Sequence, residues 1–162
     1  MKIKIFSLVL IIVATIVLLL FLKDRELVNE VKNHEYSIKY IIEPSMKGYS
    51  RKELFIDSEG NAVSTIYMID NSVIEISEGR YFQDELDDFI IYSIKQGMTK
   101  MSNDMDSKDI MDGSNIYFEI ELGDKSYNFG GYMATHVNFK FKKINSKFIE
   151  MKKKVATAQQ DP

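Results

Sequence analysis

The stretch DELDDFIIYSIKQGMTKM, residues 84–101, decides the fold class, because the hydrophobic period of the chain changes here. Its apolar residues recur every three or four positions, as on a helix that packs one side against a core. Acidic residues stand in the first turn, and Lys95 and Lys100 stand near the end, which suits the helix dipole. We therefore expect a helix over 84–101, weakened at Gly97 by about 1 kcal/mol relative to alanine.

The residues before this helix alternate between apolar and polar positions, a period typical of strands. In YSIKYII, residues 36–42, the aromatic and aliphatic side chains at every second position fall on one face. Three further short strands are expected at 52–57, 61–70 and 72–77, separated by the turn sequences DSEG and DN. Four strands therefore precede the helix.

A hairpin and a second helix follow. Residues 112–129, DGSNIYFEIELGDKSYNF, predict a hairpin that turns at GD, and Gly130-Gly131 ends its second strand. From Thr135 to Lys154 apolar residues again step by three and four, which predicts a helix with Thr135 as its N-cap. The predicted order is β-β-β-β-α-β-β-α. This order indicates an α+β fold, in which two helices pack on one face of an antiparallel sheet of about six strands.

The chain has 162 residues, which suffices for one domain of ordinary size. We expect a stalk at 23–35, the folded domain at 36–155 and a loose tail at 156–162. With 45% hydrophobic residues and two prolines, the chain is neither disordered nor fibrous. Cysteine is absent, which excludes disulfides, thiolate zinc sites, a cysteine nucleophile and lipoprotein acylation.

Residues 5–22, IFSLVLIIVATIVLLLFL, form a run without charge. As a helix this run would be roughly 27 Å long, close to the ~30 Å hydrocarbon core of a bilayer. A cleavable signal peptide is the rival interpretation, but its apolar part usually has only ~7–15 residues and ends at small side chains. We predict an uncleaved transmembrane signal anchor, which attaches the chain to the inner or cytoplasmic membrane.

The flanks of this run predict its orientation. Lys2 and Lys4 precede it without an acid, whereas the charges that follow it at 23–26 cancel. Positively charged flanks stay in the cytoplasm. We therefore expect a single-pass membrane protein with residues 1–4 in the cytoplasm and the domain in the periplasm or outside the cell.

Patterns for catalysis and metal binding are weak. The acidic loop at 104–112 fails three requirements of an EF-hand, which leaves only an irregular calcium site open there. The acidic residues in the first turn of the predicted helix suit the helix dipole better than a glycosidase pair. His34 and His136 lie far apart in the predicted fold and have no third ligand nearby. We expect no enzyme, no cofactor and no metal centre.

Charge is divided unevenly along the chain. Residues 53–124 carry a net charge of −13, and residues 125–154 carry +7. The electrostatic field of the acidic stretch would steer a partner of opposite charge, so we expect a basic protein partner and no nucleic acid. The alternative is that the acidic surface is merely solvated. The candidate partner-binding residues lie in the first turn of the predicted helix and in the loop after it: Asp84, Glu85, Asp87, Asp88, Asp104, Asp106 and Asp109.

The anchor at 5–22, the short stalk, the cysteine-free acidic α+β domain and the strand–turn–strand segment at 112–129 form a recognisable layout. This layout resembles the small membrane-anchored immunity proteins that bacteria pair with exported antibacterial toxins. The resemblance implies a protein-binding inhibitor that blocks the active site of a toxin acting outside the cytoplasm. It transfers no functional residue. A structural or assembly subunit of a cell-envelope complex is the first alternative, and a ligand-sensing domain is the second.

Overall fold

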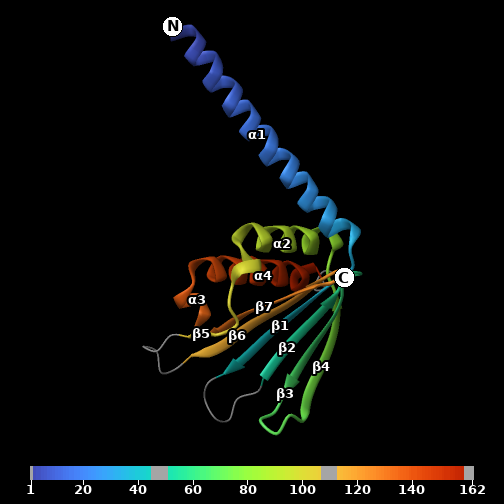
Figure 1. The fold of residues 1–162 in the computed structure, drawn as a ribbon. Coiled ribbons are helices and arrows are strands. Elements are labelled where there is room, and N and C mark those ends of the chain that lie inside the picture. Colours follow the sequence, from blue (N-terminus) through green and yellow to red (C-terminus); the bar gives the residue numbers. More distant parts are fainter. Residues whose placement is uncertain (1, 45–50, 107–112, 159–162) are drawn as a thin grey trace.

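The structure, a computed structural model, describes residues 2–44, 51–106 and 113–158, with side chains between residues 11 and 153 of these ranges. They form an α+β fold with one seven-stranded sheet (Figure 1). The helices are α1 (Lys2–Asn33), α2 (Gln83–Gln96), the short 3-10 helix η1 (Met98–Lys100), α3 (Ala134–Val137) and α4 (Phe139–Ala158). The strands are β1 (Tyr36–Pro44), β2 (Arg51–Asp57), β3 (Asn61–Tyr67), β4 (Val73–Arg80), β5 (Met105–Asp106), β6 (Ser114–Leu122) and β7 (Lys125–Tyr132).

The α+β class is confirmed, but the predicted six-stranded antiparallel sheet is wrong in strand number and order. The strands lie in the order β4-β3-β2-β1-β6-β7-β5. All neighbours are antiparallel except β5, which runs parallel to β7 and makes the sheet mixed. A two-residue strand has too few positions to show a period, so the sequence pattern could not reveal β5.

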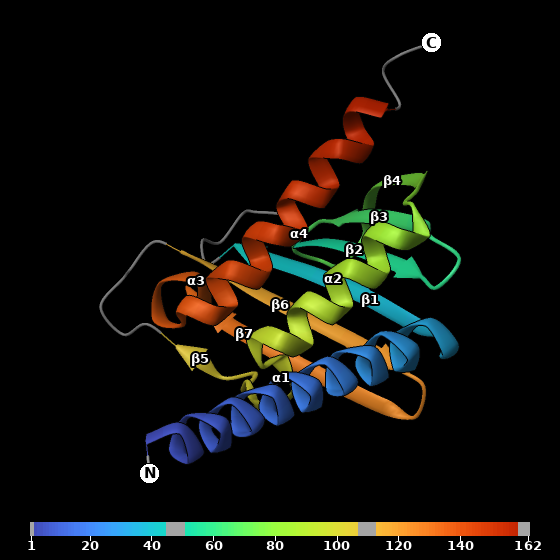
Figure 2. The same cartoon turned by 90° about the horizontal axis from the view of Figure 1, so that it is seen from above.

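Alternation in β1 places its larger apolar side chains on the face that α2 and α4 cover (Figure 2). Tyr36, Ile38 and Tyr40 are buried there, as the period-2 pattern predicts. Phe118 of β6 stands at the centre of this core. Five aromatic rings lie 4.8–5.9 Å from its ring centre: those of Tyr40, Phe89, Phe129, Phe141 and Phe148. Packing of the two helices on one face is thus explained by a shared aromatic core.

The N-terminal helix corrects the predicted location of the protein. In the part of the chain that the structure describes, no helix is long and apolar enough to span a bilayer. The predicted single-pass membrane protein, with its N-terminus in the cytoplasm and its domain outside, is therefore contradicted.

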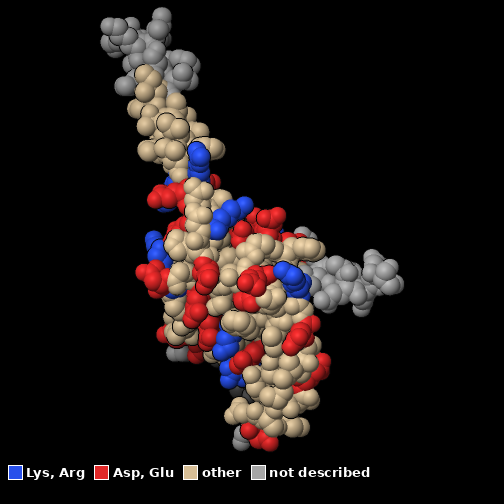
Figure 3. All heavy atoms as spheres, turned by 90° about the vertical axis from the view of Figure 1, so that its right-hand side faces the viewer, with Lys and Arg blue, Asp and Glu red and all other residues tan. Residues whose placement is uncertain are grey.

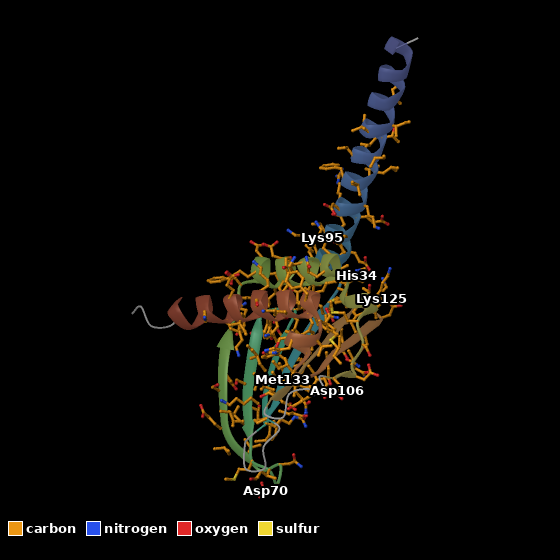
Figure 4. All side chains as sticks on the ribbon, turned by 90° about the vertical axis from the view of Figure 1, so that its left-hand side faces the viewer. His34, Asp70, Lys95, Asp106, Lys125 and Met133 are labelled. Carbon is orange, nitrogen blue, oxygen red and sulfur yellow. The ribbon has the colours of Figure 1, made fainter. Side chains whose placement is uncertain are left out.

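The last turns of α1, where the sequence predicts a stalk, are fixed to the domain. Val31 is fully buried in the core. Asp24 pairs with Lys95 of α2 at 3.1 Å, and Glu30 pairs with Lys125 of β7 at 2.5 Å. Figure 4 shows Lys95 and Lys125 where the helix meets the domain. Residues 11–22 then project away from the domain, with their large apolar side chains exposed (Figure 1).

The predicted helix over 84–101 ends earlier than its periodicity indicates. The helix α2 stops at Gln96, because Gly97 adopts the left-handed conformation with φ of 89°. A glycine in this conformation is a common helix terminator. Met98 and Met101 still pack against the core, from η1 and the residue after it, so their spacing fits the helix pattern without belonging to it.

The last helix begins at a different residue from the one predicted. The side-chain oxygen of Asn138 accepts hydrogen bonds from the backbone N–H groups of Lys140 and Phe141 at 3.0 and 3.1 Å. Asn138 therefore caps α4, whereas Thr135 lies in the separate short helix α3. The helix α4 continues to Ala158, so it takes in the start of the predicted loose tail at 156–162.

Gly130 and Gly131 lie inside β7, where the sequence predicts the end of a strand. A Cβ atom at Gly130 would lie 2.1 Å from the carbonyl oxygen of Ile116, and one at Gly131 would lie 2.0 Å from that of Met105. The two glycines therefore allow β6 and β5 to approach β7 from both sides.

Candidate functional site

Asp87, one of the acidic residues predicted to bind a partner, is buried. Its exposed fraction is 4%, and its Oδ1 accepts a hydrogen bond from the Tyr36 hydroxyl at 2.7 Å. The Gln83 side-chain amide donates to that hydroxyl at 2.9 Å. Asp87 thus joins α2 to the sheet and does not belong to a surface that a partner could contact.

The other predicted acidic contacts do not form one patch. Asp84 and Asp88 are exposed in the first turns of α2, and Glu85 beside them is half-buried. Asp104 and Asp106 are exposed beyond the far end of that helix, which is about 21 Å long at ~1.5 Å per residue. Asp109, and most of the acidic loop at 104–112 in which calcium was left open, lie outside the described residues.

The face of the sheet opposite α2 and α4 offers a different surface, which we call the open face. In the described part of the chain, no helix covers it (Figure 1). Strand register places the following side chains on this face: Ser37, Lys39, Ile41 and Glu43 of β1, Arg51, Glu53, Phe55 and Asp57 of β2, Val63, Thr65 and Tyr67 of β3, Ile76 and Glu78 of β4, and Tyr117 and Glu119 of β6.

Ion pairs connect three strands across the open face. Lys39 of β1 lies 4.0 Å from a carboxylate oxygen of Glu53 in β2 and 3.4 Å from one of Glu119 in β6. Arg51 pairs with Glu53 and, at 3.5 Å, with Glu43. The Glu53 side chain is only 16% exposed, so water screens its pairs less than it screens those of Glu119 at 44%.

Ile41 shows how closely these side chains pack. It points to the open face, yet only 4% of it is exposed. Its direct cross-strand neighbours are Glu53 and Tyr117. These two side chains flank Ile41 on the neighbouring strands. Burial and the charge of Glu43 raise the pKa of the Tyr117 hydroxyl.

Beside the ion pairs, three exposed apolar side chains form what we call the apolar stripe: Phe55, Val63 and Ile76. Their exposed fractions are 44%, 37% and 61%. Phe55 and Val63 stand directly opposite each other in β2 and β3, and Ile76 of β4 is the diagonal neighbour of Val63. The stripe therefore crosses three strands and reaches the edge of the sheet.

The turn between β3 and β4 continues this apolar surface. Met68 and Ile69 are 54% and 67% exposed. The turn is held by Asp70, whose Oδ1 accepts hydrogen bonds from the Ser72 N–H at 2.9 Å and from its hydroxyl at 2.6 Å. These bonds lower the pKa of Asp70. Figure 4 places Asp70 at the far tip of the hairpin, away from the helices.

A basic groove lies on the opposite side of the molecule, along α4. Its volume is about 720 Å³, and its lining comprises Tyr92, Phe139, Lys142, Lys143, Ser146, Lys147, Ile149, Glu150 and Lys153. All but Tyr92 come from one helix, so the groove is the outer side of α4 and not a cleft between layers. Such a surface attracts anions but supplies no enclosed geometry for catalysis.

The described residues contain no group of three His, Cys, Asp or Glu side chains that could hold a metal ion. His34 and His136 have separate surroundings. The Nδ1 of His34 lies 2.7 Å from the carbonyl oxygen of Glu30, and the Nδ1 of His136 lies 3.3 Å from the Thr135 hydroxyl. The two histidines therefore do not share a site.

A signal for the open face is present in the sequence. In KELFID, residues 52–57, three apolar residues stand in succession, so both faces of the strand carry an apolar side chain. On a strand with only one buried face, Phe55 would be expected to be polar. The partner-binding residues were predicted from charge alone, so Phe55 was not among them.

Comparison of the chain with protein-family models and with curated proteins finds no match.

Proposed function

We propose that this chain is a protein-binding domain whose contact surface is the open face. The observation that carries the proposal is the apolar stripe, in which Phe55, Val63 and Ile76 are 37–61% exposed on a sheet face that no described helix covers. Exposed apolar clusters rimmed by polar side chains are typical of protein–protein contacts.

The surroundings of the stripe support the same function. Tyr67 and Tyr117 lie on this face, and the Arg51 guanidinium carbon is 6.0 Å from the centre of the Tyr67 ring. Tyrosine and arginine are enriched in protein interfaces, where aromatic anchors contribute much of the affinity. The ion pairs of Lys39 and Glu53 provide the polar rim.

We propose inhibition as the role of this binding: the chain covers the active site of a toxin, as an immunity protein does. The acidic stretch at 53–124, with its net charge of −13, favours a basic toxin by electrostatic steering. The open face and the exposed acids of α2 lie on opposite faces of the sheet, so one compact partner cannot cover both. The two surfaces can therefore be tested separately.

An assembly subunit is the second candidate function, and α1 favours it. The apolar side chains of α1 between Ile11 and Leu22 are 50–65% exposed. A helix with such a surface can pack against other helices of a complex. In that case, substituting Val17 and Leu20 with glutamine would release the chain from its complex, whereas changes to the open face would not.

The test compares two matched variants of the full chain. Phe55→Ser with Val63→Ser alters the open face, and the control, Phe139→Ser with Ile149→Ser, removes two exposed apolar side chains from α4. Phe139 and Ile149 are 69% and 38% exposed, so the control loses at least as much exposed apolar surface. Each variant is tested for binding kinetics against the products of neighbouring genes, and the bound partner is assayed for activity with and without the chain.

We expect the open-face variant to lose about tenfold or more in affinity, while the control changes less than about twofold. Inhibition of the bound partner by the wild-type chain supports the immunity role, and binding without inhibition supports assembly. Equal affinities for the two variants would contradict the open face as the contact surface. Loss of binding in Asp84→Lys with Asp88→Lys would instead locate the contact on α2.

A further inference from the structure

The strand β4 is an open edge of the sheet. It stands first in the strand order and pairs only with β3 within the described residues. Seven of its eight residues are exposed, Gly79 being the half-buried one. The N–H and C=O groups on the outer side of an edge strand have no partner in the sheet and can pair with an added strand.

Three of the eight residues of β4 are charged, and its exposed apolar side chains leave the rest of this edge unprotected. Natural edge strands are usually short, charged or interrupted by proline. Here Val73, Ile74 and Ile76 are 52–61% exposed. A register shift near Ile66 and Tyr67 disturbs the first part of the strand, but pairing from Glu75 to Arg80 is regular. That regular part of the edge is six residues long.

The edge is also continuous with the apolar stripe. Ile76 belongs to both, because it points to the open face from the outermost strand. Figure 3 shows this side of the molecule, where the hairpin presents mostly uncharged surface next to Asp and Glu side chains. A segment that binds along β4 would therefore extend the open face without a break.

Charge selects the occupant of the edge. Glu75 and Glu78 lie on β4 itself and Asp70 lies in the turn before it, with Arg80 as the single base of the strand. A second copy would bring two acidic edges together, and like charges in cross-strand positions destabilise pairing. A segment with lysine or arginine opposite Glu75 and Glu78 would instead form attractive cross-strand charge pairs.

We propose that β4 binds an extended basic segment of a protein partner, which adds an eighth strand to the sheet. This inference rests on the proposed protein-binding function and names its mode of recognition. Glu75 and Glu78 point to opposite faces, because their β3 partners Ile66 and Val63 do so. An antiparallel segment would therefore read basic–any–apolar–basic, with its apolar residue opposite Ile76.

The probe is the blocked peptide Thr-Thr-Lys-Thr-Val-Lys-Thr-Thr, and its control carries glutamate in place of both lysines. Each is titrated to millimolar concentration into the ¹⁵N-labelled full chain. We expect amide shifts concentrated in residues 73–80 and slower hydrogen exchange at alternate amides of β4 for the lysine peptide only. Shifts located elsewhere, or no shift at all, would overturn the proposal.

Variants of the full chain test the role of charge. Glu75→Lys with Glu78→Lys should weaken binding of the peptide about tenfold at low salt, because two attractive cross-strand pairs become repulsive. The matched control, Asp84→Lys with Asp88→Lys, makes the same change of charge on α2 and should leave binding within about twofold. If the lysine variant does not fold, Glu75→Gln with Glu78→Gln replaces it. Equal weakening in both variants would mean nonspecific attraction and would overturn the proposal.

The two sets of variants distinguish failure of the added strand on β4 from failure of the open face as the contact surface. A partner that is lost from the Phe55→Ser, Val63→Ser variant but binds the β4 variants normally supports the open face and overturns the added strand. Dimerisation of the wild-type chain that depends on Glu75 and Glu78 would identify a second copy as the occupant and would overturn the basic partner. Loss of the partner in both sets of variants supports both proposals.

Discussion

The hydroxyl of Tyr36, the first residue of β1, donates a hydrogen bond of 2.7 Å to the Asp87 carboxyl group of α2, and both residues are 4% exposed. This contact joins positions 51 residues apart in the chain. It joins the start of β1, the central strand, to α2, which covers the sheet. Because Asp87 is buried by this contact, it is not part of the acidic surface.

Loss of this hydrogen bond should destabilise the fold. Tyr36→Phe should lower the free energy of unfolding by about 1–3 kcal/mol, because it leaves the buried Asp87 Oδ1 with only the longer hydrogen bond of 3.4 Å from the Gln83 side-chain amide. Urea unfolding of the full chain measures the change, with Tyr67→Phe on the open face as a control expected to change it by less than about 0.5 kcal/mol. A double variant, Tyr36→Phe with Asp87→Leu, should recover part of the loss. Additive losses in the double variant would contradict this coupling.

Stability should fall in strong alkali. Burial raises the pKa of Tyr40 to about 12 and that of Tyr81 to about 12. Above the unfolded value of about 10, the unfolded chain loses these protons while the folded chain keeps them, so stability is present below pH 10 and is lost between about pH 10 and 12. Each group should contribute a slope of about 1.4 kcal/mol per pH unit. Tyr81→Phe should reduce the slope measured by urea unfolding across this range, and an unchanged slope would contradict the prediction.

The aromatic core should depend strongly on Phe89. This residue of α2 is fully buried, and its ring centre lies 5.9 Å from that of Phe118 and 5.1 Å from that of Phe148. Phe89→Ala should cost about 3–5 kcal/mol in urea unfolding, from lost burial and the cavity left behind. Phe82, just before the same helix, is 66% exposed, and Phe82→Ala should cost less than about 1 kcal/mol. Similar costs for the two variants would show that α2 does not pack on the sheet.

Two glycines with positive φ should respond differently to alanine. Gly130 has φ of 140° and no room for a Cβ beside Ile116, whereas Gly97 has φ of 89° and its nearest contact would be the Lys140 Nζ at 3.9 Å. Gly97→Ala should therefore cost about 1 kcal/mol from backbone strain alone. Gly130→Ala should cost more than about 2 kcal/mol, because β6 must also shift. Thermal unfolding compares the two, and equal costs would show that the close approach of β6 to β7 is unimportant.

Periodic segments were predictable, and single capping or pairing residues were not. Buried and exposed positions repeat regularly in the strand around Tyr36, Ile38 and Tyr40 and in the helix through Phe89. Several residues in each segment therefore indicate the same secondary structure. The ends of α2 at Gly97 and of α4 at Asn138 depend on one backbone conformation or one side-chain hydrogen bond. A single residue gives no periodic signal, and both ends were misplaced for this reason.

The sequence by itself determined the α+β class, the four strands before the first core helix and the apolar faces that meet in the core, because burial of alternating or helically spaced side chains is a local requirement. Only the tertiary structure decided which polar residues reach the surface. Asp87 and Asp88 are adjacent and alike in sequence, yet one bonds to Tyr36 inside the core and the other is exposed. The tertiary structure also left Phe55, Val63 and Ile76 uncovered, because both core helices pack on the other face of the sheet. The position of a helix on one face or the other depends on contacts between distant segments, and no local pattern of residues records those contacts.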